Sequence, residues 1–273
     1  MLQTLAKGFQ RSLRQSSIHH PRQLPFLPKR QLTTMAKNEF YQYSIITALM
    51  DGAASDGIPI STLLENGDHG LGTFIDMFGE MIVLDGQVYQ MKSDGSIVHI
   101  SSPSTTRTPF ACVTRFEATS TSKASLKGAD LKQEINQLLD SHFPTGRNHI
   151  LAIRMDGTFA RIRARTAGGQ CKPRESMMAV AERQSEYTFQ NIKGTMIGFR
   201  CPEWVTGLNV VGHHLHFISD DRQQGGHVLG FQTDGEVEVQ LSLLPKFSME
   251  LPTEGEFNKA GLVVDAEGIA ACE

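Results

Sequence analysis

Four of the ten histidines of this chain fall within residues 210–231, "VVGHHLHFISDDRQQGGHVLGF". The segment "NVVGHHLHFI" is rich in β-branched and apolar residues and predicts a strand, "SDDRQQGG" predicts a turn, and "HVLGFQ" predicts the returning strand. Side chains alternate across a strand, so His214 and His216 share one face and His213 points to the other. If residue 218 pairs with residue 227, His227 lies on the face of His214 and His216.

Three imidazoles on one face of a hairpin would suit a divalent metal ion. Neutral His nitrogens bind Zn²⁺, and also Fe²⁺, Mn²⁺ or Co²⁺, and three protein ligands leave the open coordination position of a catalytic site. The alternative is that this His-x-His pair is only a surface feature of a strand. The third histidine, after a Gly-Gly turn, favours the metal site. We expect His213 to face solvent or to support the ligands from behind.

Other polar residues could serve chemistry at such a site. Arg161, Arg163 and Arg165 alternate along "TFARIRART", which usually indicates a solvated face, but one arginine aimed at a metal pocket would hold a substrate carboxylate through two hydrogen bonds. "GDHGLGTFIDMFGE" contains Thr73 and Glu80 and lacks the spacing of phosphate-binding loops. The chain ends in "GIAACE", and a terminal residue such as Glu273 is normally frayed.

The elements that must position these residues are hairpins and a few helices. Helices are predicted over "YSIITALMDG" from about Ser44 to Gly52, over "ADLKQEINQLLDSHF" behind an Asp130 cap, and over "ESMMAVAERQ". Four Asp-Gly pairs between strand-like segments predict hairpin turns. They are Asp85-Gly86, Asp94-Gly95, Asp156-Gly157 and Asp234-Gly235. This mixture predicts an α+β fold, with a boundary between two subdomains near residues 168–190.

The composition indicates a soluble globular protein, with 40% apolar and 20% charged residues among 273. No apolar run approaches the roughly 20 residues needed to span a bilayer. The four cysteines are far apart and form no Cys-x-x-Cys pair. We therefore expect neither a disulfide framework nor a cysteine-type zinc site. We expect the protein to reside in a reducing compartment.

Residues 1–38 differ from the rest of the chain in charge. They contain seven Lys and Arg and no Asp or Glu, which is typical of a mitochondrial or plastid transit peptide, and they predict a disordered targeting segment with the mitochondrial matrix as destination. The alternatives are a basic arm that binds an acidic partner, and initiation at Met35 to give a cytoplasmic form. The body, residues 39–273, is acidic, which argues against nucleic acid as a partner.

Several segments of the body resemble one known family in order from about Tyr41 to the C-terminus. They are "YSIITALMDG", "GDHGLGTF", "GEMIVLDGQVYQMKSDG", "TPFACVTRF", "AIRMDGTF", "GTMIGFRCPEW" and "GHHLHFISDDRQQGGHVLGF". Together they are similar to alpha-acetolactate decarboxylase, and the spacing of His-x-His-Phe and Gly-Gly-His is the most specific part of the match. Residues 1–38 are not part of the resemblance.

The resemblance implies an activity and a set of site residues. Family members are carbon-carbon lyases that convert 2-acetolactate to acetoin and CO₂, through a zinc-stabilised enediolate and without an organic cofactor. The resemblance also implies two similar domains with mixed or antiparallel sheets and flanking helices, and a homodimer. The family's residues fall on His214, His216 and His227 as zinc ligands, on Arg165, Glu80 and Glu273 as catalytic residues, and on Thr73 and Arg165 for substrate binding.

The chain also departs from the family, and other functions stay open. His69 in "GDHG" stands where bacterial relatives commonly have Phe, and we expect it to pack in the core. His213 replaces an aromatic residue, and relatives usually continue beyond the position of Glu273. A cupin-type dioxygenase also uses His-x-His with Fe²⁺, but its jelly roll is all-β. A non-catalytic metal-binding protein would not require Arg165 and Glu80.

Overall fold

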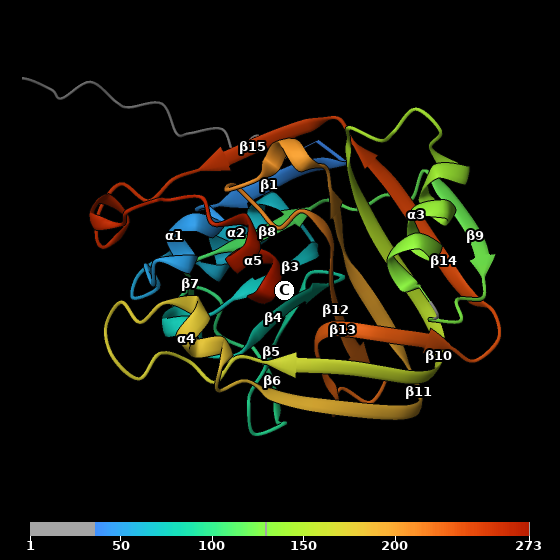
Figure 1. The fold of residues 1–273 in the computed structure, drawn as a ribbon, viewed down its shortest axis with the longest axis horizontal. Coiled ribbons are helices and arrows are strands. Elements are labelled where there is room, and N and C mark those ends of the chain that lie inside the picture. Colours follow the sequence, from blue (N-terminus) through green and yellow to red (C-terminus); the bar gives the residue numbers. More distant parts are fainter. Residues whose placement is uncertain (1–35, 129, 273) are drawn as a thin grey trace, which may run out of the picture. The chain divides into compact units, whose positions relative to one another are not determined.

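The computed structural model describes residues 36–128 and 130–272 of this chain. These residues form two main sheets of seven and six strands with short helices around them (Figure 1). The predicted α+β class is confirmed. Residues 1–35 and Glu273 lie outside the described residues, so the targeting segment and the role of Glu273 stay predictions.

The first sheet is mixed, because the strand closest to the C-terminus returns to its edge. Its order is β15-β1-β8-β3-β4-β5-β6, and β15 pairs with β1 in parallel while the other neighbours are antiparallel. The strands are β1 (Glu39–Tyr43), β3 (His69–Thr73), β4 (Glu80–Leu84), β5 (Gln87–Met91), β6 (Ile97–His99), β8 (Ala111–Thr114) and β15 (Lys246–Glu250).

The second sheet is antiparallel, with the order β11-β12-β13-β10-β14-β9. Strands β10 and β11 are long and also pair with each other, so β10, β13, β12 and β11 form a closed circuit of paired strands. The strands are β9 (Ser120–Ala124), β10 (Ile150–Thr166), β11 (Ser185–Cys201), β12 (Gly212–Ser219), β13 (Gly225–Thr233) and β14 (Val237–Leu244).

The helices are short and lie at the ends and faces of the sheets. The three helices predicted from sequence are present, and the longest, α3, begins behind Asp130, whose carboxylate accepts a hydrogen bond from the Gln133 N–H at 3.0 Å. Every helix in the described part of the chain is too short or too polar to span a bilayer. The helices are α1 (Ile46–Met50), α2 (Ile60–Asn66), α3 (Leu131–His142), α4 (Met177–Ala181) and α5 (Ala266–Cys272). Three single 3₁₀ turns, η1 (Ile75–Met77), η2 (Glu203–Val205) and η3 (Phe257–Lys259), and a two-stranded ribbon of β2 (Ile58–Pro59) and β7 (Arg107–Thr108) complete the elements.

Two of the four predicted hairpin turns are wrong. Asp85-Gly86 and Asp94-Gly95 connect paired strands. Asp234-Gly235 connects β13 to β14, which do not pair because β10 lies between them, and Asp156-Gly157 lies inside β10. Here β10 changes partner, because residues up to Asp156 pair with β14 and residues from Phe159 pair with β13. A Cβ atom at Gly157 would lie 2.6 Å from the side chain of Val237, so this glycine allows a close approach of strands and does not form a turn.

The expected boundary near residues 168–190 does not coincide with the passage between the sheets. The chain leaves the first sheet after β8 and enters the second at β9. Residues 168–190 instead follow β10 and include the first residues of β11, and these two strands pair along most of their length. This segment is therefore a connection within the second sheet, and it carries α4.

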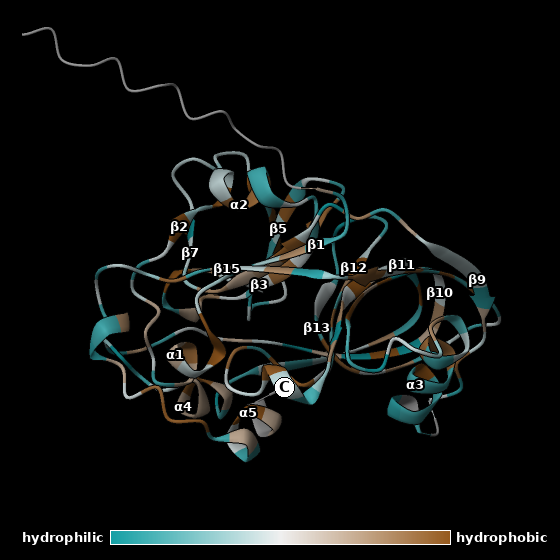
Figure 2. Ribbon diagram, turned by 90° about the horizontal axis from the view of Figure 1, so that it is seen from above, coloured by the Kyte–Doolittle hydropathy of each residue, from teal (hydrophilic) through white to brown (hydrophobic). Residues whose placement is uncertain are grey.

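Apolar side chains from both sheets form a common core between them. Figure 2 shows hydrophobic colouring along the strands of both sheets. Burial of this apolar surface is what holds the sheets against each other. The apolar cluster shared by the two sheets contains Phe40, Leu71 and Cys112 from the first sheet and Ile150, Ala152 and Phe199 from the second.

His69 belongs to this core and does not line the site described below. Its ring stacks on Phe116, with centroids 4.5 Å apart, and meets the edge of Phe199. It is 2% exposed, and its Nε2 atom has no hydrogen-bond partner among the described residues. Burial, reinforced by the charge of Arg154, lowers the pKa of His69 to about 3. The histidine therefore packs as a neutral aromatic ring.

The neutral state of His69 predicts an acid-sensitive fold. The unfolded chain takes up a proton at His69 below about pH 6.5 and the folded chain does not until about pH 3, so stability is complete above pH 6.5 and falls as the pH drops. For this one group the loss between pH 7 and pH 5 is about 2 kcal/mol. We expect His69→Phe to reduce the pH 7 to pH 5 loss by about that amount in urea unfolding. An unchanged difference between the two pH values would contradict the buried neutral state.

Candidate metal centre and cavity

The three histidines singled out by spacing converge in the structure. His214 and His216 lie on β12, and His227 lies on β13. In the observed register His227 is opposite His216, and Ile218 is opposite Gly225. The assumed pairing of residues 218 and 227 was wrong by two residues. A shift of two keeps the same face of the strand, so His227 joins the other two as predicted.

The three rings are close enough to hold one ion. Their centroids are 5.0 to 5.4 Å apart, and one nitrogen from each ring lies within 4.8 Å of the others. His214 is 7% exposed, His216 is 0% and His227 is 2%. Three buried nitrogen donors at this spacing suit a tetrahedral ion such as zinc with one position left for another ligand.

The protonation of these histidines also suits a metal. Burial, together with the nearby charge of Arg165, lowers the pKa of His214 to about 3, and burial holds the pKa of His216 well below its usual value. Nδ1 of His216 lies 2.7 Å from the carbonyl oxygen of Met81. Because a carbonyl can only accept, Nδ1 carries the proton and the lone pair is on Nε2. That Nε2 atom is buried and has no hydrogen-bond partner among the described residues.

Arg165 lies beside the histidines on the neighbouring strand, β10. It lies on β10 opposite His227 and is 3% exposed. Arg161 and Arg163 on the same strand are exposed, so the three arginines do not share one environment as the simple alternation suggested. The pairing of β10 with β13 is interrupted between Arg163 and Ala164 by one extra residue on β13, whereas the pairing of β10 with β11 is unbroken there. Arg165 is buried where Glu80 of the first sheet meets it.

The first sheet supplies the acidic partner. Glu80 on β4 places Oε1 3.4 Å from Nη1 of Arg165 and 3.3 Å from the backbone N–H of Ala167, and its Oε2 lies 3.6 Å from Nε2 of His216. The Glu80 side chain is 9% exposed. A buried carboxylate at this position offsets the charge of the buried arginine, which would otherwise be costly to desolvate.

Thr73 stands beside Glu80 because the two are paired residues of the β3–β4 hairpin. Its hydroxyl donates a hydrogen bond to the carbonyl oxygen of Gly79 at 2.8 Å, which fixes the side chain at the edge of the site. Thr73, Glu80, Arg165, His214 and His227 line one cavity. Two separate sheets therefore contribute the polar end of this cavity.

The other end of the cavity is apolar. Its wall comes mainly from α1 and α4, together with two residues of the first sheet's loops. These residues are Ile46, Leu49, Met77, Phe110, Met177, Val180 and Ala181. Sequence reasoning predicted both helices but did not connect them to the site, because the periodicity of a five-residue helix does not say what its apolar face meets. The cavity suits a small ligand with a polar, chelating end and alkyl groups.

His213 does not line this cavity, as strand alternation predicts. His213 points to the other side of β12, opposite Arg200 in the pairing with β11. Burial, with the charges of Arg200 and Lys132, lowers the pKa of His213 to about 4. Glu273 lies outside the described residues. The helix before it, α5, packs Ile269 into the cluster that contains Ile46 and Val180.

A family model described as alpha-acetolactate decarboxylase matches residues 40–264 of the chain. Curated proteins of that name are similar along most of its length. The protein from Methanosarcina mazei is 41% identical over 231 residues, which cover 85% of this chain and 78% of the relative. The protein from Brevibacillus brevis is 37% identical and covers 83% of this chain and 77% of the relative.

Solved structures of the same kind share the fold. The crystal structure of alpha-acetolactate decarboxylase from Bacillus subtilis strain 168 aligns with a TM-score of 0.80 and 33% identity, covering 86% of this chain and 99% of that one. A crystal structure from Staphylococcus aureus, described as similar to alpha-acetolactate decarboxylase, aligns with a TM-score of 0.79 and 29% identity.

The geometry predicts that loss of His216 weakens metal binding, whereas loss of the nearby His213 does not. We expect purified His216→Ala, dialysed against zinc and then against buffer, to retain well under half of the wild-type zinc, because a three-nitrogen site loses one ligand. His213→Ala is the matched control, since its ring lies on the opposite side of the same strand, and it should bind zinc as the wild type does. Zinc content is measured by atomic emission on samples with matching circular dichroism. Equal zinc in both variants would refute the ligand assignment.

Proposed function

This chain belongs to the alpha-acetolactate decarboxylase family, and we propose on that premise that it is a carboxy-lyase converting 2-acetolactate to acetoin and CO₂. The observation that supports this most directly is the set of buried donors around one cavity. His214, His227, Arg165 and Glu80 line its polar end, the buried His216 lies beside them, and apolar residues form the rest of the wall.

The chemistry of the substrate explains why such a set is needed. Loss of CO₂ leaves an electron pair on the carbon that carried the carboxylate, and this charge must delocalise onto the adjacent ketone oxygen. His214, His216 and His227 would hold the metal, which we propose to be zinc. When bound, it supplies a Lewis acid toward the hydroxyl and ketone oxygens. The lowered pKa values of His214 and His216 leave both rings neutral, as metal ligands must be.

Arg165 is proposed to hold the carboxylate that leaves. Its guanidinium is planar and can donate two parallel hydrogen bonds to a carboxylate, and its burial makes these bonds stronger than they would be in water. Holding the carboxylate in one orientation keeps the breaking C–C bond aligned with the π system of the ketone. Glu80, in contact with the same guanidinium, restricts where Arg165 can point.

A proton must then reach one face of the enediolate carbon. Arginine is a poor acid because its pKa exceeds about 12. Glu80 lies within reach of both Arg165 and His216 and is proposed to pass the proton, directly or through a water molecule. Thr73 is proposed to contact the substrate from the cavity edge. Glu273 is proposed to join the acidic residues of the site on the strength of the family resemblance.

The rival functions receive less support. A cupin-type dioxygenase would have an all-β jelly roll, whereas this chain has a mixed sheet, an antiparallel sheet and helices that wall the cavity. A protein that only binds metal would not require a buried arginine beside the histidines, since placing that charge there is costly.

The proposals about assembly and location still rest on the sequence. The homodimer is proposed from the family resemblance, and a targeting role from the basic residues 1–38. The relatives named above are archaeal and bacterial and give no support to a mitochondrial address, so the cytoplasmic alternative stands beside it. N-terminal sequencing of the mature protein would decide between the two.

Turnover of racemic 2-acetolactate with removal of metal tests the proposed reaction. We expect acetoin and CO₂ in equal amounts under anaerobic conditions, loss of at least about 90% of the rate after chelation, and recovery on adding zinc. Acetoin is measured by a colorimetric assay and CO₂ by manometry. No acetoin above the uncatalysed rate with the zinc-loaded protein would rule the function out, and a requirement for oxygen would favour the dioxygenase.

Substitution of two arginines on β10 tests whether Arg165 holds the substrate carboxylate. We expect Arg165→Lys to lower kcat/KM by about 100-fold or more, because lysine keeps the charge but loses the planar pair of donors. Arg163→Lys, two residues earlier and exposed, should stay within about twofold of wild type. Both variants are compared by steady-state kinetics with 2-acetolactate. Similar losses in both would contradict the special role of Arg165.

A further inference from the structure

Helix α4 forms part of the apolar wall of the cavity, through Met177, Val180 and Ala181. A helix of five residues is far below the length at which helices are stable in water, about 12–15 residues. Its position must therefore be set by the contacts of the segment that carries it. Val180 is 1% exposed and packs with Ile46 and Leu49 of α1, so the two helices meet across the apolar end of the cavity.

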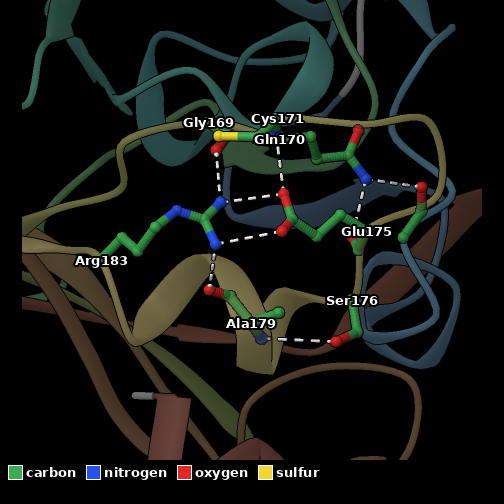
Figure 3. A network of polar contacts seen from close by, with 8 residues as sticks. Gly169, Gln170, Cys171, Glu175, Ser176, Ala179 and Arg183 are labelled. Carbon is green, nitrogen blue, oxygen red and sulfur yellow. Dashed lines mark hydrogen bonds and ion pairs between the residues drawn. The ribbon is translucent and has the colours of Figure 1, made fainter.

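An ion pair with a buried carboxylate connects the two ends of α4 (Figure 3). Glu175 precedes the helix and Arg183 follows it. The Glu175 carboxylate accepts hydrogen bonds from Nη1 of Arg183 at 3.0 Å, from Nη2 at 2.8 Å and from the backbone N–H of Cys171 at 2.7 Å. Arg183 also donates to the carbonyl oxygen of Ala179 within the helix, at 2.8 Å. The pair therefore joins both ends of α4 to one carboxylate.

The Glu175 carboxylate is held as an anion in this arrangement. Its side chain is 8% exposed, whereas that of Arg183 is 41% exposed. The hydrogen bonds from Arg183 and then from the Cys171 N–H keep the pKa of Glu175 below its ordinary value. A neutral amide of the same shape would keep one acceptor oxygen but would lose the charge that orders the guanidinium.

The same network is connected to α1. The side-chain amide of Gln170 donates to the carbonyl oxygens of Gly52 at 2.9 Å and of Glu175 at 2.8 Å. Gly52 follows α1 with φ +82°, and a Cβ atom there would lie 2.6 Å from the carbonyl oxygen of Glu175. Arg174 forms an ion pair with Asp51 at the same place. The loop before α4 is therefore packed tightly on the end of α1.

We propose that Glu175 is a positioning residue that sets the distance between α4 and α1, and through it the size of alkyl group that the cavity accepts on the reacting carbon of the substrate. This rests on the proposed decarboxylase function. With the hydroxyl, ketone and carboxylate groups of 2-acetolactate at the polar end, its two methyl groups are left for the wall of α1 and α4. A pocket of this kind distinguishes one methylene group by about 10- to 200-fold.

Kinetics with two substrates test this role. The substrates are 2-acetolactate, with a methyl group on the reacting carbon, and its homologue with an ethyl group there. For Glu175→Gln we expect KM for 2-acetolactate to rise about fivefold with kcat within about twofold, because the wall is displaced and the polar end is intact. The ratio of kcat/KM for the methyl over the ethyl substrate should fall by about fivefold or more.

Two further variants make the result decisive. Glu182→Gln makes the same chemical change at an exposed position of the same segment and should keep the wild-type ratio. Arg183→Lys removes the planar donors from the more exposed partner and should shift the ratio as Glu175→Gln does, so it decides the matter if Glu175→Gln does not fold. A purely structural role would lower the rates with both substrates equally and leave the ratio unchanged.

Wild-type activity tests the proposed function, and the substrate ratio of the variants tests the role of Glu175. An active wild type whose Glu175→Gln and Arg183→Lys variants fold and keep its substrate ratio would overturn the positioning role alone. A wild type that is inactive with both substrates would overturn the proposed function and this inference with it. A lower ratio in either variant, with Glu182→Gln unchanged, would support the role of Glu175.

Discussion

The pairing of β10, β13 and β12 places Arg165, His227 and His216 in one row across a sheet. Neighbouring strands are about 4.8 Å apart, so residues in register come within reach of a single ion or small molecule. A slip of one residue in either pairing would turn a ligand to the opposite face. Gly226, with φ +153° and no room for a Cβ atom beside the Arg165 carbonyl, allows the close approach that this register needs.

The row is incomplete without the other sheet. Arg165 is buried and would carry an uncompensated charge if Glu80 were absent, and the tautomer of His216 is set by the carbonyl oxygen of Met81. Glu80 and Met81 are neighbours on β4. The apolar core between the sheets therefore also shapes the site, because it fixes β4 against β12 and so brings the carboxylate and the carbonyl to the histidines.

The cavity has both polar and apolar lining residues. Its polar end is built on long paired strands, whose geometry is rigid, and its apolar end on helices of five residues each. Short helices take their positions from their surroundings, and here these include the packing of Val180 on α1 and the hydrogen bonds of Glu175. The polar and the apolar lining of the cavity are thus held by different kinds of interaction.

The sequence by itself determined the α+β class, the three histidines and their common face, because strand alternation is a local property that a two-residue error in register does not alter. Tertiary structure alone decided that Asp156-Gly157 continues a strand, that Arg165 is buried while Arg163 is exposed, and that Glu80 meets Arg165 across 85 positions of sequence. It also decided that α1 and α4 face each other over the cavity. Such contacts depend on which strands pair and which faces pack, and these choices arise from burial summed over the whole core, so no short segment encodes them.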